Sequence, residues 1–214
     1  MGENHRIAEA LLNIRAVALS LDPPFTWVSG IRSPIYCDNR LLISHPDARN
    51  LVIDRFVEEI RQMKVQPDVI AGTATSGIPF AAWVADRLNL PMVYVRAAKK
   101  EHGKGKAIEG HLQSGANTLV IEDLISTGKS SVAVVEHLLE AGATVTGVLA
   151  IFSYELPKAD ETFKGVNIEP LPLETISSLL NLAVSRGDIS REDAAVINDF
   201  RNDPQGWYDR NFSV

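Results

Sequence analysis

The chain has 214 residues, 45% of them hydrophobic and 22% charged, which is enough to bury the core of one globular α/β domain. Its formal net charge of −6 argues against a broad nucleic-acid-binding face, and its single cysteine, Cys37, excludes an internal disulfide. The apolar runs are too short to cross a membrane and the charged N-terminus lacks an export signal, so we expect a cytoplasmic protein.

The first third of the chain predicts two helices separated by a turn-rich segment. Apolar residues recur at helical spacing over residues 5–19, namely Ile7, Leu11, Ile14 and Ala18. Three prolines and a glycine then mark a loop over residues 21–40. Ser44 is placed to cap a second helix, whose apolar face consists of Val52, Phe56, Ile60 and Met63.

From residue 68 onward, short apolar strands alternate with helices. We expect strands over residues 68–71, 92–95, 119–121 and 145–152, and helices over 78–88, 130–141, 174–185 and 191–200. This alternation predicts an α/β fold with a mostly parallel twisted sheet flanked by helices. Ligands bind such sheets at the carboxyl ends of the strands, which directs attention to the loops that begin near residues 71, 95 and 122.

The segment VIEDLISTGKSS, residues 120–131, joins two carboxylates to a small, hydroxyl-rich turn. A nucleotide-triphosphatase loop needs a glycine where Asp123 stands, whereas an ordinary strand end and turn would explain either half alone. The combination suits a phosphosugar. The backbone N–H groups and hydroxyls of residues 126–130, at the start of a helix, can hold a monophosphate. Glu122 and Asp123 can accept hydrogen bonds from sugar hydroxyls and stabilise positive charge on a ribose ring.

Two further loops fit a polyanionic ligand. The segment 95–111 gathers five cations of this acidic protein among three glycines: Arg96, Lys99, Lys100, Lys104 and Lys106. Such a run is either a solvated basic hairpin or a mobile lid that excludes water. The loop over residues 71–79 consists of small residues whose amides could approach an anion closely, although an ordinary turn and helix cap would look the same.

Residues 120–130 resemble the phosphoribosyl-pyrophosphate (PRPP) motif of the type I phosphoribosyltransferases: apolar residues, two acids, two apolar residues and a hydroxyl-Thr-Gly turn. The segment FTWVSGIRSPIYCDNR and the Arg, Lys, Lys-x-His-Gly spacing of the basic loop resemble the orotate phosphoribosyltransferases of that family. The resemblance extends over nearly the whole chain. It implies one phosphoribosyltransferase domain over residues 1–214, in which residues 1–45 contribute a hood over the base site. It also implies transfer of the 5-phosphoribosyl group from PRPP to orotate, which yields orotidine 5'-monophosphate and pyrophosphate in UMP biosynthesis.

The same resemblance assigns roles to individual residues. The lid residues that contact PRPP are expected to be Arg96, Lys100 and His102, with Lys100 acting catalytically on the departing pyrophosphate. Glu122 and Asp123 are expected to be catalytic as well, and Ser126 to touch orotate. The PRPP-binding set then continues through Glu122, Asp123, Leu124, Ile125, Ser126, Thr127, Gly128, Lys129 and Ser130.

The resemblance also implies a cofactor and a partner. Mg²⁺ is expected to bind mainly through PRPP and water, without a protein cage. A lid that reaches the neighbouring subunit's site implies a homodimer, and no nucleic-acid or membrane partner is expected.

Three positions depart from the family pattern. Val28 and Ala97 stand where many members have a basic residue, and no arginine follows the strand near residues 152–155. Arg32 or backbone amides of the hood are expected to serve in orotate binding instead. Two other functions stay open: a purine phosphoribosyltransferase, which would share the PRPP motif, and a PRPP-sensing regulator without catalysis.

Overall fold

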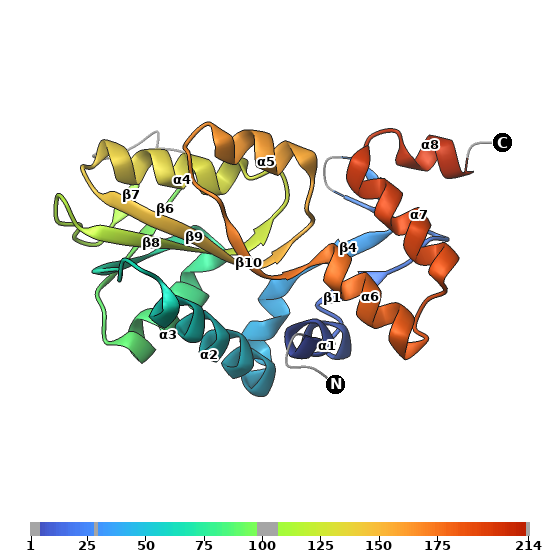
Figure 1. Cartoon of the computed structure of the whole chain (residues 1–214), viewed down its shortest axis with the longest axis horizontal. Helices are drawn as coiled ribbons and strands as arrows, with labels where there is room; N and C mark the ends of the chain where they lie inside the picture. The colour runs from blue at the N-terminus through green and yellow to red at the C-terminus, as the bar shows by residue number, and fades with distance from the viewer. Residues whose placement is uncertain (1–4, 28–29, 98–106, 213–214) are drawn as a thin grey trace.

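The structure is a computed structural model that describes residues 5–27, 30–97 and 107–212. A six-stranded sheet in the order β10-β9-β8-β5-β6-β7 forms its centre (Figure 1). The strands are β5 (Val69–Thr73), β6 (Met92–Val95), β7 (Ile108–Glu109), β8 (Asn117–Ile125), β9 (Thr144–Ser153) and β10 (Leu171–Thr175). Every neighbouring pair is parallel except β6 and β7. The predicted fold class is therefore confirmed.

Helices cover both faces of this sheet. On one face lie α2 (Pro46–Gln62) and α3 (Gly77–Leu88), and on the other α4 (Lys129–Glu140) and α5 (Pro157–Lys164) (Figure 1). Successive residues of a strand point to opposite faces. Along β8, Leu119 and Ile121 accordingly join the hydrophobic core on the α2 and α3 side, and Val120 joins the core on the α4 side. Burial on both faces explains why the inner strands read as nearly continuous apolar runs.

The N-terminal segment folds into small elements beside the sheet. They are α1 (Arg6–Asn13), β1 (Val17–Leu19), β2 (Phe25–Thr26), β3 (Arg32–Ser33), β4 (Ile35–Cys37) and the 3₁₀ helix η2 (Asn39–Ser44). β1 pairs with β4 and β2 with β3, both antiparallel. We call the described part of this segment, residues 5–27 and 30–45, the hood.

The hood packs against three C-terminal helices, α6 (Ile176–Arg186), α7 (Arg191–Asn202) and α8 (Trp207–Phe212), which lie on the same side of the molecule in Figure 1. The Trp27 ring lies 5.5 Å from that of Phe200, and the Arg32 guanidinium lies 4.6 Å above the ring of Tyr208. Within the described residues, no helix is long and apolar enough to cross a membrane.

Some predicted boundaries were wrong. The first helix ends at Asn13 because Arg15 adopts a left-handed backbone conformation, and residues 17–19 then pair with β4. Ser44 does not cap α2; it ends η2, and Pro46 opens the helix. The strand expected over residues 119–121 continues to Ile125, since its pairing with β9 extends that far. Three further elements, α5, β10 and α8, were not predicted from the sequence.

A glycine allows α3 to begin directly against β8. A Cβ at Gly77 would lie 2.6 Å from the carbonyl oxygen of Ile121 and 3.5 Å from the Cα of Glu122. Real Cβ atoms do not approach a backbone oxygen so closely, so only glycine fits here. The absent side chain thus brings the loop before α3 to the end of β8.

We expect Gly77→Ala to lower the free energy of unfolding by about 1–3 kcal/mol, because α3 must move away from β8. Gly147→Ala is the matched control, since its Cβ would meet no atom closer than Leu119 Cδ1 at 3.5 Å. That variant should change the free energy of unfolding by about 0.5 kcal/mol or less. Urea denaturation of the three proteins measures the difference. Equal stability of both variants would contradict the packing described here.

Candidate active site

The structure brings most of the predicted site residues to one edge of the sheet. β6, β5 and β8 are parallel neighbours, so the segments that follow them meet at their carboxyl ends. These segments contribute Arg96, the loop over residues 74–76, and the acid pair with its turn over residues 122–130. Lys100 and His102 lie outside the described residues.

Glu122 is buried at the end of β8 and turns toward α4. Only 4% of the residue is exposed. Its Oε2 accepts a hydrogen bond from the Ser131 hydroxyl at 2.9 Å, and its Oε1 accepts one from the backbone N–H of Asp123 at 3.0 Å. Both carboxyl oxygens are therefore held by the protein itself.

Asp123 lies on the hood side of the strand and is only partly buried. The Asn39 side-chain amide donates a hydrogen bond to its carbonyl oxygen at 2.6 Å. Arg40, next to Asn39, is exposed and pairs with Asp38, with 2.6 Å between Nε and Oδ1. Asp123 is thus more exposed than Glu122 and lies on the opposite side of the strand.

The two carboxyl groups do not ionise independently. Burial raises the pKa of Glu122 to about 8, and the negative charge of Asp123 adds to the effect. Burial also raises the pKa of Asp123, although hydrogen bonds and the Arg40 charge oppose the shift. We infer that without a ligand the pair keeps one proton near neutral pH. A positive charge placed beside it would favour the loss of that proton.

The turn after the acids leads directly into α4. Gly128 has a φ of 75°, and a Cβ on it would lie 2.9 Å from the ring of Phe163, so glycine is required on both grounds. In the part of the chain that the structure describes, no side chain caps the helix at Gly128. The first N–H groups of a helix lack partners within it. They are available here to an anion, which the helix dipole also favours.

The loop between β5 and α3 lies beside the acids, and its peptide bond between Ala74 and Thr75 is cis. Within the described ranges, no hydrogen-bond partner reaches the buried hydroxyl of Thr73, at the end of β5. Nor does any side chain of those ranges cap α3 at Ser76. This loop therefore offers a second set of polar groups at the same edge.

Arg96 stands at the base of the predicted lid, where it contacts β7. Its Nη1 donates to Glu109 Oε1 at 2.6 Å, and its guanidinium lies 5.3 Å from the centre of the Tyr94 ring. The pKa of Arg96 is raised, chiefly by this bond to Glu109. Glu109 thus holds the Arg96 side chain. A bound anion would have to displace the Glu109 carboxylate or share the guanidinium with it.

Among the described residues, no three His, Cys, Asp or Glu side chains converge closely enough to hold a metal ion. Both oxygens of Glu122 accept hydrogen bonds within the protein, and the Asp123 carboxyl accepts bonds from backbone N–H groups of its own strand.

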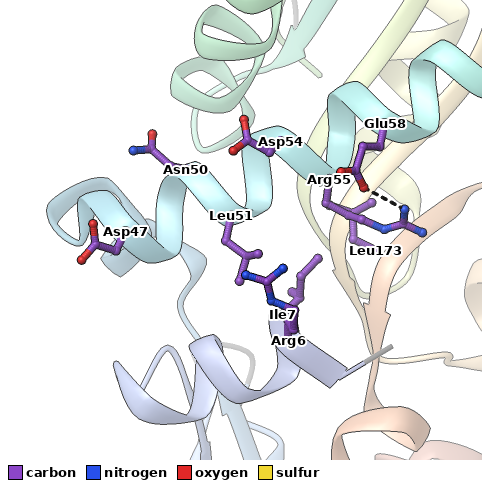
Figure 2. A pocket seen from close by; sticks show the side chains of 9 residues that line it. All are labelled: Arg6, Ile7, Asp47, Asn50, Leu51, Asp54, Arg55, Glu58 and Leu173. Carbon is purple, nitrogen blue, oxygen red and sulfur yellow. Dashed lines mark hydrogen bonds and ion pairs between the residues drawn. The ribbon is translucent and has the colours of Figure 1, made fainter. Parts of the chain in front are cut away.

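A cavity elsewhere contains none of the predicted residues. It has a volume of about 530 Å³ and lies between α1 and α2, where Figure 2 shows its lining side chains. Among its charged side chains, Arg55 pairs with Glu58 at 3.2 Å. Because none of the predicted residues lines this cavity, we place the site at the strand ends.

Comparisons with known proteins agree with this geometry. The family described as phosphoribosyl transferase domain matches residues 43–164. An orotate phosphoribosyltransferase of Coxiella burnetii is 48% identical over 207 residues, which cover 97% of this chain and 99% of that one. One of Bacillus caldolyticus is 50% identical over 203 residues, covering 95% and 98%. The chain belongs to the orotate phosphoribosyltransferase family.

A solved structure supports the same assignment. The orotate phosphoribosyltransferase of Aeropyrum pernix superposes with a TM-score of 0.72 at 28% identity, covering 82% of this chain and 97% of that one. The predicted family, enzyme class and place in pyrimidine biosynthesis are confirmed.

Three polar residues make contacts that the sequence alone does not predict. Ser131 holds Glu122, Asn39 holds Asp123, and Arg201 of α7 donates to Glu155 at 3.2 Å just beyond β9. Ser131 alone left a local signal, because it directly follows the motif at the start of a helix. The other two lie far from their partners in the sequence, so no spacing rule could find them.

The raised pKa of Glu122 predicts a pH-dependent stability. Its ordinary value is 4.5, so between about pH 4.5 and 8 the folded state keeps a proton that the unfolded chain has lost. The free energy of unfolding must then fall as pH rises through this window, by at most about 1.4 kcal/mol per pH unit. Glu122→Gln should flatten this fall.

Urea denaturation at pH 5, 6.5 and 8 measures the slope. The amide introduced by Glu122→Gln can still bond to Ser131, whose hydroxyl donates or accepts. Glu58→Gln serves as control, since that side chain is 59% exposed, and it should keep the wild-type slope. Equal slopes for wild type and Glu122→Gln would show that Glu122 is ionised throughout.

Proposed function

We propose that this site transfers the 5-phosphoribosyl group of PRPP to orotate, forming orotidine 5'-monophosphate and pyrophosphate. The observation that carries the proposal is the acid pair at the end of β8, followed at once by a turn into the N-terminus of α4. A pentose with a phosphate on its 5-position needs these two environments side by side.

Each part of the substrate then has a counterpart. The phosphate binds to the backbone N–H groups and hydroxyls of residues 126–130, at the positive end of α4. Asp123 accepts hydrogen bonds from ribose hydroxyls, while Glu122 supports it from the buried side. As the bond at C1 breaks, positive charge develops on the ribose, and the acid pair stabilises that charge.

The diphosphate is assigned to the loop before α3 and to the basic lid. Amides of residues 75–77 and the buried Thr73 hydroxyl suit this role, supported by the closeness of Gly77 to Glu122. Arg96, Lys100 and His102 complete the charge compensation, and Lys100 acts on the departing pyrophosphate. Mg²⁺ would be bound by PRPP oxygens, water and Asp123, and would neutralise diphosphate charge.

The base lies under the hood, with Ser126 as one orotate contact. Orotate reacts through a ring nitrogen that is activated as an anion, so no strong protein base is required. The chain forms a homodimer in which the lid completes the neighbour's site. That arrangement explains why cations are concentrated in one loop of an acidic protein.

The decisive assay follows orotate consumption by ultraviolet absorbance in the presence of PRPP and Mg²⁺. Turnover with orotate should exceed turnover with hypoxanthine or adenine.

Asp123→Asn should lower kcat/KM by about 100-fold or more, because the positive charge that develops on the ribose loses the carboxylate that stabilises it. Asp47→Asn, in the cavity of Figure 2, should keep wild-type kinetics. Turnover of a purine alone, or an active Asp123→Asn, would contradict the proposal.

The shared site can be tested with two inactive variants. Lys100→Ala and Asp123→Asn subunits, dissociated and reassociated together, should recover about a quarter of wild-type activity. Half of randomly mixed dimers are hybrids, and each hybrid has one site with neither substitution. No recovery, in samples shown by mass to contain hybrids, would mean that each lid serves its own subunit.

A further inference from the structure

One buried side chain connects the hood to the acid pair. Asn39, at the start of η2, is 1% exposed. Its Nδ2 donates to the carbonyl oxygen of Asp123 at 2.6 Å, and its Oδ1 accepts from the Cys37 thiol at 3.4 Å. With a partner at each end, the amide has one orientation that satisfies both groups.

The surroundings hold Asn39 in place. Asp38 caps η2 by accepting from the backbone N–H of Arg40 at 3.2 Å, and the two side chains also pair. The bonded carbonyl belongs to the peptide between Asp123 and Leu124. Its orientation sets both the direction of the Asp123 carboxyl and the path of the chain toward the phosphate turn.

We propose that Asn39 is a positioning residue for the transfer reaction, fixing the Asp123 peptide so that its carboxylate and the following turn face one substrate. This inference rests on the proposed function. It makes the hood part of the ribose site as well as a cover for the base. Glu122 is fixed independently, by Ser131 on the opposite side of the strand.

Asn39→Asp tests this directly, because the two side chains have the same shape. When protonated, its carboxyl group can donate to the Asp123 carbonyl; when ionised, it cannot, and its charge faces that oxygen. The titratable groups beside it are Cys37, Asp38, Arg40 and Asp123, and Tyr154 lies near Cys37. Burial among acids favours the protonated form well above the ordinary range.

The experiment compares kcat/KM for PRPP between pH 5.5 and 8.5, each value divided by that of wild type. Asn39→Asp should lose about tenfold or more at pH 8.5 and recover most of the loss at pH 5.5. Asn39→Ala lacks a donor at every pH, so its loss should be of similar size and independent of pH.

Thr118→Val is the matched control. Thr118 is fully buried on the same strand, at the end far from the acids, and its hydroxyl donates to the Ala116 carbonyl at 3.2 Å. This variant should lose stability but keep a kcat/KM ratio near one. All assays are run where denaturation curves show each protein folded.

Two results would overturn the inference. One is wild-type kcat/KM in folded Asn39→Ala and Asn39→Asp. The other is an equal loss of kcat/KM in both variants at every pH, which would show that Asn39 has only a structural role. Failure of the proposed function would appear separately, as a wild-type protein that does not consume orotate.

Discussion

Two adjacent carboxyl groups at the end of β8, one buried and one partly buried, constrain the rest of the site. A buried acid is tolerated only where hydrogen bonds replace water. Glu122 obtains them from Ser131 and from its own strand, and the Asp123 peptide obtains one from Asn39. Gly77 lets one helix begin against the acids, and Gly128 turns the chain into another. These neighbours fix the acids in place before any ligand binds.

This arrangement explains how anionic side chains can stand so near a turn that we propose to bind phosphate. The raised pKa of Glu122 means that the unliganded pair keeps a proton near neutral pH, which limits its repulsion of phosphate. The positive end of the α4 dipole lies a few residues downstream. Positive charge that develops on the ribose would favour loss of this proton. The acid pair would then carry its full negative charge in the transition state.

The sequence revealed the contiguous part of this site and the fold that carries it. Residues 120–131 hold the acids, the turn and the helix start in one segment, so their chemistry can be read locally. Asn39 is 84 residues from Asp123, and only the folded chain brings them together. β10 was not predicted because it is an edge strand that contains a proline, Pro172, and a proline within an apolar run argues against a strand. The first helix was predicted too long because residues 17–19 pair with β4 although their apolar residues continue the helical spacing.

The most direct test of the central claim is a crystal structure with PRPP bound. The account predicts the 5-phosphate on the backbone N–H groups of residues 126–130 and the ribose hydroxyls within hydrogen-bond distance of Asp123. A phosphate bound elsewhere, with an empty turn and the Asp123 carboxylate directed away from the sugar, would contradict it.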